Sequence, residues 1–305
     1  MAVEPRGPSR TAVLTAAARA LHREEPPPWV LDDRLALALA GDDGHRLAER
    51  LRAELTPPAL LDFARWCCVR ARLPEDTVER ALAGGVRQYV ILGAGLDSFA
   101  YRRGDLVDRL RVFEVDHPAS QAWKRRRLDE LGVSPPPSLV FAAVDFEHQT
   151  LRAGLEVAGF DFGATAVFSW IGVTLYLTLE AIAATLATVA ACPAGTRIVL
   201  TYNRPGSALS GVGLETQTAL AGIAGELGEP IVTLFEPDEI ERLLRDHGFG
   251  QIEHFGPDEA VRTYFAGRDD VRFGGAQRLV GATVARVPAR RAASVMKKAA
   301  PGALA

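Results

Sequence analysis

The residues best suited to chemistry are a glycine-rich loop and several carboxylates that each follow a short apolar run. Residues 87–92 read RQYVIL, and residues 93–98 continue directly as GAGLDS. Glycine lets a backbone approach a ligand without a Cβ in the way. Open α/β sheets bind ligands at the carboxyl ends of their strands, which is where this loop would lie. A tight turn is the alternative interpretation. As ligand-binding residues the loop offers Gly93, Ala94, Gly95 and Asp97.

Two further acids stand at the end of the next predicted strand. Residues 111–115 read RVFEV, and Asp116 follows them. Glu114 and Asp116 lie about 20 residues beyond Gly95, the spacing at which a carboxylate binds a ribose diol in dinucleotide-binding folds. The alternative for Asp116 is an N-cap of the helix expected from about residue 119. We favour the ligand interpretation for the pair.

A third predicted strand, residues 139–144, ends in Asp145 and Phe146. A carboxylate accepts a hydrogen bond from the exocyclic amine of adenine, and an aromatic ring packs on the base. The alternative is an Asp-initiated surface turn. Because three successive strand ends bear matching groups, we expect these residues to bind adenine.

The pattern of apolar residues indicates which elements position these groups. Short β-branched runs alternate with longer helical segments, which predicts an α/β protein with a mostly parallel sheet and helices on both faces. The predicted parallel strands cover residues 87–92, 111–115, 139–144, 165–170 and 196–202. The predicted helices between them cover residues 120–131, 150–158 and 179–191.

The two ends of the chain differ from this alternating part. Helices are expected over residues 11–22, 31–40, 60–72 and 75–83, with a loop at 41–44 and a break at Pro74. A helical insert is expected near residues 206–228, an amphipathic helix over 237–247, and a last pair of strands over 251–255 and 279–287. We therefore divide the chain into an N-terminal helical cap (1–85), a ligand-binding domain (86–287) and a disordered tail (288–305).

Composition narrows the class of protein. The 305 residues include 35 Lys and Arg against 38 Asp and Glu, a net charge of −3, which argues against nucleic-acid binding through bulk charge. The three cysteines, of which Cys67 and Cys68 are adjacent, suit neither a disulfide scaffold nor a closed zinc site, so no metal is expected. No targeting signal and no apolar run of about 18 residues is present, so we expect a cytoplasmic protein without a membrane partner.

Two cofactor classes compete for the glycine loop. A dehydrogenase fingerprint requires a third glycine, and Ser98 stands in its place. Asp97 adds a negative charge beside a pyrophosphate, which prefers bare amides at a helix N-terminus. A sulfonium amino acid has no phosphate and tolerates that acid. The sequence therefore favours S-adenosyl-L-methionine over a nicotinamide dinucleotide.

Long blocks of the chain resemble a known family. Residues 85–102 (GVRQYVILGAGLDSFAYR) look like the signature of the leucine carboxyl methyltransferase superfamily, and most of all like its bacterial S-adenosylmethionine-dependent branch. Residues 113–118, 144–146 and 172–177 match further blocks, and the resemblance covers roughly residues 10–285. It implies a class I methyltransferase (Rossmann-like) fold, with a seven-stranded sheet, one antiparallel strand in the last pair and an N-terminal helical cap.

The resemblance also implies roles for individual residues. Arg70 corresponds to an arginine that pairs with the methionine carboxylate, the glycine loop would pass beside the methionine, and Asp116 with Glu114 would bind ribose. We also count Trp170, at the end of the fourth strand, among the cofactor-binding residues. Where many relatives have an acid near the methionine ammonium, this chain has Ile171.

The acceptor side is less specific. A carboxylate acceptor needs no base for in-line displacement, whereas a hydroxyl acceptor benefits from one. Tyr202 is the candidate catalytic base, with Asn203 beside it and Tyr176 and His117 as weaker candidates. The apolar N-terminal helices and the insert suggest a small-molecule acceptor rather than a protein C-terminus, and the oligomeric state stays open. We therefore expect O-methylation of a carboxylate or hydroxyl, with an NAD-dependent oxidoreductase or a non-catalytic S-adenosylmethionine-binding protein as alternatives.

Overall fold

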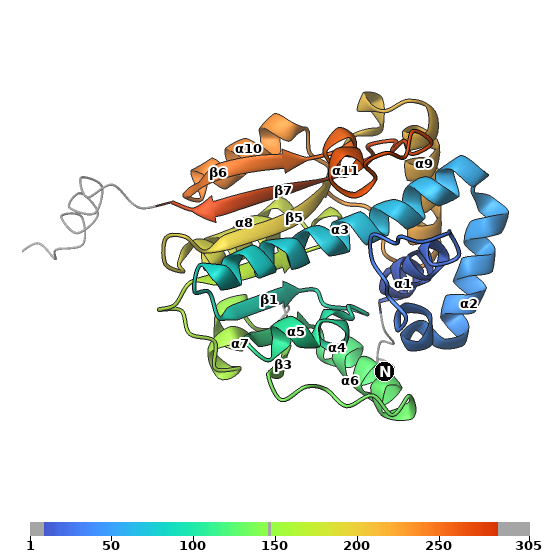
Figure 1. The fold of residues 1–305 in the computed structure, drawn as a ribbon. Helices are drawn as coiled ribbons and strands as arrows, with labels where there is room; N and C mark the ends of the chain where they lie inside the picture. Colours follow the sequence, from blue (N-terminus) through green and yellow to red (C-terminus); the bar gives the residue numbers. More distant parts are fainter. Residues whose placement is uncertain (1–8, 146–147, 286–305) are drawn as a thin grey trace, which may run out of the picture.

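One seven-stranded sheet positions the candidate residues (Figure 1). The computed structural model describes residues 9–145 and 148–285. The strand order is β3-β2-β1-β4-β5-β7-β6, in which β7 runs antiparallel to both of its neighbours and the other pairings are parallel. The strands are β1 (Gln88–Leu92), β2 (Arg111–Asp116), β3 (Leu139–Ala143), β4 (Ala166–Trp170), β5 (Arg197–Asn203), β6 (Phe249–Phe255) and β7 (Gln277–Val284). The predicted sheet and its antiparallel last pair are thus confirmed.

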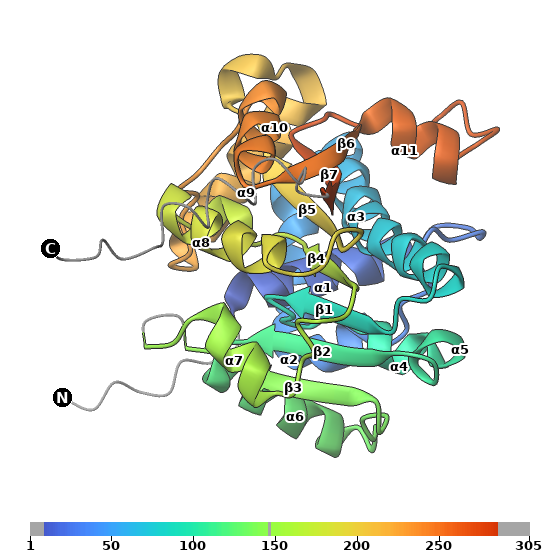
Figure 2. The ribbon, with the colours of Figure 1, turned by 90° about the vertical axis from the view of Figure 1, so that its left-hand side faces the viewer.

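Helices cover both faces of the sheet (Figure 2). Because side chains alternate along a strand, Val90 and Leu92 pack into one core, with α7, α8 and α10, while Tyr89 and Ile91 pack into another, with α3 (Pro57–Ala83), α4 and α5. The helices are α4 (Phe99–Arg102), α5 (Gly104–Val107), α6 (Pro118–Glu130), α7 (Leu151–Val157), α8 (Leu179–Ala190), α10 (Pro237–Asp246) and α11 (Pro257–Tyr264). Two short 3-10 helices, η1 (Thr174–Tyr176) and η2 (Gly206–Ala208), follow β4 and β5.

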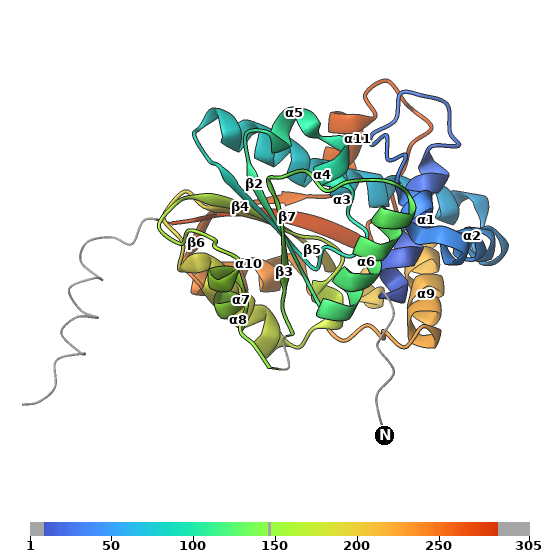
Figure 3. The same ribbon diagram turned by 90° about the horizontal axis from the view of Figure 1, so that it is seen from below.

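A helical cap lies over the carboxyl ends of the parallel strands (Figures 1 and 3). It consists of α1 (Arg10–His22), α2 (Ala36–Glu54), the first half of α3 (Pro57–Ala83) and α9 (Gly211–Glu226), which share an apolar core. The start of α1 is fixed to the segment after α9, because Glu229 accepts hydrogen bonds from Ser9 Oγ (2.8 Å) and from the Thr11 hydroxyl. The predicted insert near 206–228 therefore contains α9, the fourth helix of the cap.

Two N-terminal predictions are wrong. The break expected at Pro74 does not occur: α3 runs through it as one helix of 27 residues. Proline removes one backbone donor from a helix, but here the turns before and after it pack into separate apolar cores, which hold the helix together. The loop expected at 41–44 is only a kink, since Gly41 adopts φ 62° inside α2.

The remaining expectations concern the C-terminal tail, the cysteines and membrane-spanning helices. The tail predicted over 288–305 lies outside the described residues, as does Phe146. All three cysteines are buried free thiols, as expected for small apolar residues. In the described part of the chain, none of the helices combines the length and apolar character needed to cross a membrane.

Candidate active site

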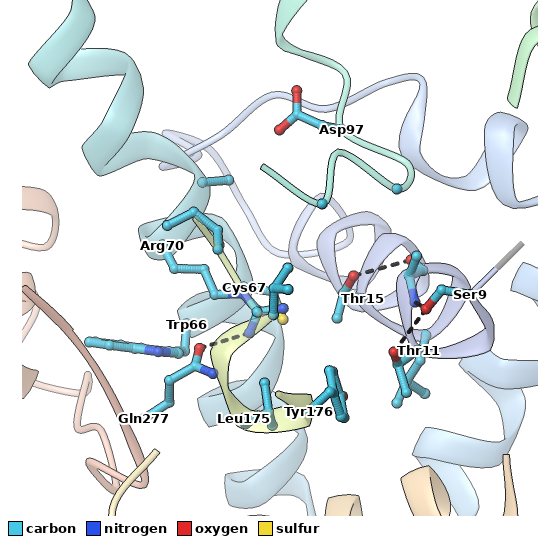
Figure 4. Close-up of a pocket in the computed structure, with 18 of the residues that line it drawn as sticks. Ser9, Thr11, Thr15, Trp66, Cys67, Arg70, Asp97, Leu175, Tyr176 and Gln277 are labelled. Carbon is cyan, nitrogen blue, oxygen red and sulfur yellow. Dashed lines mark hydrogen bonds between the residues drawn. The ribbon is translucent and has the colours of Figure 1, made fainter. Parts of the chain in front are cut away.

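A cavity of about 290 Å³ lies where the strands end and the cap begins. Its walls come from the loops after β1 and β4, from β5 and β7, and from helices α1, α3 and α9 (Figure 4). The sequence-predicted residues that line it are Arg70, Gly93, Ala94, Gly95, Asp97, Asp116, Ile171, Tyr176 and Asn203. The structure therefore brings the first and second strand ends together with Arg70.

The glycine loop fits against Val173 and α1 only because Gly93 and Gly95 lack side chains. Gly93 and Gly95 adopt φ angles of +67° and +47°, in the left-handed region. A Cβ on Gly93 would lie 2.5 Å from Val173 Cγ2, and one on Gly95 would lie 2.9 Å from the Ala12 Cβ. Both the backbone conformation and the space thus require glycine.

Replacing Gly95 by alanine should therefore destabilise the protein by about 1–3 kcal/mol, from the left-handed backbone and the contact with Ala12. Urea unfolding measures the change. Gly222→Ala is the matched control, because Gly222 lies in α9 and a Cβ added there would meet nothing within 4 Å. That substitution should raise stability by about 0.5–1 kcal/mol. Equal effects of the two variants would contradict this account of the loop.

Asp116 joins the ends of β1 and β2. Its Oδ2 accepts a hydrogen bond from the Gly95 amide at 2.5 Å, and its Oδ1 accepts one from the His117 amide at 2.7 Å. Burial raises the pKa of this carboxyl, and the two amides act against that shift. Each carboxylate oxygen has further lone pairs, so Asp116 can hold the loop and still accept hydrogen bonds from a ligand in the cavity.

Glu114 occupies a different environment from Asp116. Its side chain is 1% exposed, does not line the cavity and pairs with buried Lys124 at 2.6 Å. The Lys124 ammonium also donates to the Asp97 carbonyl at 2.7 Å. Burial raises the pKa of Glu114 to about 7 although Lys124 opposes the shift. The geometry therefore corrects the ribose role expected for Glu114. Instead, Glu114 holds Lys124, which donates a hydrogen bond to the backbone of the glycine loop.

Arg70 is a buried cation that lines the cavity, as is Arg19, which pairs with Asp33. The Arg70 side chain comes from α3, and its Nη1 donates to Gln277 Oε1 at 2.7 Å (Figure 4). Gln277 Nε2 in turn donates to Asn203 Oδ1 at 2.8 Å. No carboxylate lies within ion-pair distance of Arg70 among the residues that the structure describes. A buried guanidinium without an acidic partner favours an anionic ligand group.

Two other predicted residues, Trp170 and Asp145, lie off the cavity, and Phe146 falls outside the described residues. Trp170 is 2% exposed and packs into the apolar core beneath the sheet. Asp145 lies after β3 and accepts a hydrogen bond from His148 Nδ1, at 3.0 Å, if that nitrogen carries the proton. Neither Trp170 nor Asp145 lines the cavity. The structure thus corrects the cofactor contact expected of Trp170, while the adenine role of Asp145 stays a prediction.

The structure also corrects the role of Tyr202. Its side chain is fully buried in the core between the sheet and α10, and its hydroxyl hydrogen-bonds His254 Nδ1 at 3.0 Å. Burial raises its pKa to about 12. Asn203, the next residue along β5, points the opposite way and lines the cavity. His117 caps α6 by accepting from the Ala119 amide at 3.2 Å.

Arg70 on α3 was predicted from the sequence, but Asp62 and Trp66 on the same face of that helix were not. Asp62, Trp66 and Arg70 are spaced four residues apart, so they lie on one face of the helix, and all three line the cavity. Gln277 on β7 was missed as well. The four-residue spacing of a charged, an aromatic and a second charged residue in an apolar helix was the available signal for this face.

The fold and the site together define a Rossmann-like methyltransferase with an N-terminal helical cap. A family model described as "Leucine carboxyl methyltransferase" matches residues 12–190. The protein named "Putative S-adenosyl-L-methionine-dependent methyltransferase YktD" from Bacillus subtilis is 31% identical over 284 residues, covering 86% of this chain and 93% of that protein. The chain belongs to the leucine carboxyl methyltransferase family, and it is an enzyme.

Further relatives agree with this assignment. A Mycobacterium avium protein, also named as an S-adenosyl-L-methionine-dependent methyltransferase, is 39% identical over 171 residues, 56% of each chain. Among solved structures, a Thermobifida fusca protein described as a methyltransferase has a TM-score of 0.56 at 19% identity, covering 92% of this chain and 96% of that one. At that identity the structural likeness shows the shared fold.

Proposed function

We propose that this enzyme transfers a methyl group from S-adenosyl-L-methionine to an oxygen atom of a small, largely apolar acceptor. The observation that carries the proposal is Arg70, a buried guanidinium that lines the cavity without an acidic partner among the described residues. An α-carboxylate is the group that best matches its planar fork. Family membership supplies the methyl-transfer chemistry that this cation fits.

The other cavity residues fit the remaining parts of that cofactor. The backbone at Gly93 and Gly95, which has no side chains, leaves room in the cavity for the methionine part of the cofactor. Asp116 offers carboxylate oxygens suited to the ribose hydroxyls. When bound, the cofactor supplies an electrophilic methyl group on a sulfonium sulfur. Many relatives have an acid at the position of Ile171, near the methionine ammonium. In this chain Asp97, which lines the same cavity, is the acid available to that ammonium.

The protein's own contribution would be alignment and exclusion of water. Helices α1, α3 and α9 close the cavity above the strand ends, and its acceptor side is lined by apolar residues such as Phe63, Leu220 and Ala224. In-line displacement gains most from holding the two reacting atoms in a dry, fixed arrangement. The apolar wall supports a small acceptor of low polarity.

Hydride transfer is the weaker alternative. Asp97 lines the cavity at the glycine loop, where a dinucleotide would place its pyrophosphate. Membership of a methyltransferase family also favours methyl transfer over hydride transfer. The same membership argues against a protein that only binds the cofactor.

A metabolite screen with methyl-labelled S-adenosylmethionine tests the proposal. We expect label to appear on the oxygen of a small apolar compound, in a reaction that adenosylhomocysteine inhibits. Label on nitrogen or carbon alone would contradict O-methylation. Absence of label from every compound, with adenosylhomocysteine bound tightly, would favour the non-catalytic alternative.

A further inference from the structure

The acceptor end of the cavity contains a carboxyl group that the proposed function does not yet use. Asp62 lies on α3, one turn from Trp66 and two turns from Arg70. Eight residues of helix separate the Arg70 and Asp62 backbones by about 12 Å along the axis. The Arg70 guanidinium lies beside Gly172 in the loop after β4, whereas the Asp62 carboxyl lies beside Gly274 and Thr216 of α9, so the two charged groups are in different parts of the cavity.

Asp62 has a hydrogen-bond donor but no cationic partner. Its Oδ1 accepts from the Gly274 amide at 2.9 Å, and its residue exposure is 6%. No Lys, Arg or His nitrogen lies within 4 Å of this carboxyl in residues 9–145 and 148–285. Burial raises the pKa of Asp62, while the Gly274 amide and the Thr216 hydroxyl act in the opposite sense. A buried carboxyl in this environment is a stronger base than an exposed one.

Three further polar atoms of the same wall are buried without a hydrogen-bond partner. They are Trp66 Nε1, a donor, Gln217 Oε1, an acceptor, and the Thr216 hydroxyl oxygen, on residues that are 6%, 9% and 3% exposed. Gln217 is held by its other amide atom, since Nε2 donates to the Arg204 carbonyl at 2.8 Å. Buried polar atoms normally have partners, so unpartnered ones beside a cavity indicate where a ligand supplies them.

The charges at this end argue against an anionic acceptor. Arg19, which also lines the cavity, is neutralised by Asp33 at 2.8 Å and donates to the Leu96 carbonyl. Arg70 lies at the other end and is assigned to the cofactor carboxylate. A carboxylate acceptor would therefore face Asp62 without a compensating cation, at a substantial electrostatic cost.

We infer that the acceptor is a neutral hydroxyl compound with an apolar body, whose hydroxyl donates to Asp62. This inference rests on the proposed function and narrows it to one acceptor class. As the acceptor oxygen forms its bond to the methyl carbon, the hydroxyl proton passes to Asp62. The bond from that carbon to sulfur breaks with its electron pair remaining on sulfur. Trp66 Nε1 and Gln217 Oε1 are then positioned to bind other polar atoms of the acceptor.

Ligand-binding NMR on the adenosylhomocysteine-loaded enzyme tests this assignment, with phenol, benzoate and benzylamine as probes. We expect the wild-type enzyme to bind phenol in preference to the other two. Asp62→Asn keeps an oxygen for the Gly274 amide but removes the charge, so phenol should bind about tenfold more weakly. Benzoate should bind at least about tenfold more tightly to that variant, because the repulsion is gone.

Opposite changes for phenol and benzoate distinguish recognition from a general loss of structure, which would weaken both. Asp129→Asn, on the exposed side of α6, is the matched control and should change neither. If Asp62→Asn does not fold, Trp66→Phe decides with catechol as the probe, because the second hydroxyl of catechol can accept from Trp66 Nε1. Catechol should bind that variant several-fold more weakly, while phenol binding changes little and benzoate stays excluded.

Several results would overturn the inference. Benzoate or benzylamine binding to the wild type as tightly as phenol would exclude the hydroxyl class. Unchanged phenol binding in Asp62→Asn, or no binding of any probe to an enzyme loaded with adenosylhomocysteine, would exclude Asp62 as the acceptor contact. Failure of adenosylhomocysteine itself to bind would instead contradict the proposed function, so the two failures are distinguishable.

Discussion

Replacing Arg70 by leucine is expected to weaken adenosylhomocysteine binding about 100-fold or more. The physical reason is that the ligand carboxylate would enter a buried site with no cation to pair with, a loss typical of a truncated buried charge pair. Isothermal titration calorimetry measures it. Methylthioadenosine carries the nucleoside but no carboxylate, so its affinity should change little in the same variant.

The matched control is Arg72→Leu. Arg72 lies two residues further along α3, pairs with Asp76 at 2.6 Å and does not line the cavity. The Arg72→Leu variant should therefore bind adenosylhomocysteine with the same affinity as the wild-type enzyme. If Arg70→Leu weakens methylthioadenosine as much as adenosylhomocysteine, Arg70 supports the cavity wall rather than the ligand carboxylate, and the assignment is wrong.

Replacing Lys124 by methionine is expected to reduce the free energy of unfolding by about 3–5 kcal/mol, because it leaves the Glu114 carboxyl buried without its cation. Urea unfolding measures the loss. Arg126→Met, on the exposed side of the same helix, should change stability by less than about 0.5 kcal/mol. The double variant Glu114→Gln with Lys124→Met should recover much of the loss, since neither charge then remains.

The same pair gives stability a pH dependence of known sign. Burial raises the folded-state pKa of Glu114 from 4.5 to about 7. Between these values the unfolded chain has released a proton that the folded state retains, so this group's contribution lowers stability as pH rises from 4.5 to about 7. Glu114→Gln should remove that decline from a series of unfolding curves. An unchanged pH profile in the variant would show that Glu114 does not titrate in this range.

The parts of the site that could be predicted from sequence are those fixed by strand ends. β1, β2 and β4 are short and apolar, and a parallel sheet brings their carboxyl ends to one edge, where Gly93, Gly95 and Asp116 line the cavity. The sheet itself followed from the alternation of strands and helices. The prediction of the sheet does not depend on the exact first and last residue of each strand or helix.

The parts that failed depend on which way a side chain points. Tyr202 and Asn203 are neighbours on β5, so they face opposite sides of the sheet, and the sequence does not show which one reaches the cavity. Glu114 likewise points to the α6 side, where Lys124 meets it. Pro74 misled for another reason, because packing of α3 on two cores outweighed the local preference for a break.

The acceptor wall was out of reach for a related reason. Asp62 and Gln217 are far apart in sequence and meet only because α3 and α9 pack together over the sheet edge. Each residue alone reads as an ordinary polar position on a helix. Their burial, and the absence of a cation beside Asp62 in the described residues, become visible only in three dimensions.

The central claim is that this cavity binds S-adenosylmethionine rather than a nicotinamide dinucleotide. A calorimetric titration of the wild-type enzyme with adenosylhomocysteine, and a parallel titration with NAD, tests it most directly. The structure predicts saturable one-to-one binding of adenosylhomocysteine and no measurable heat with NAD. Clear binding of NAD with none of adenosylhomocysteine would contradict it.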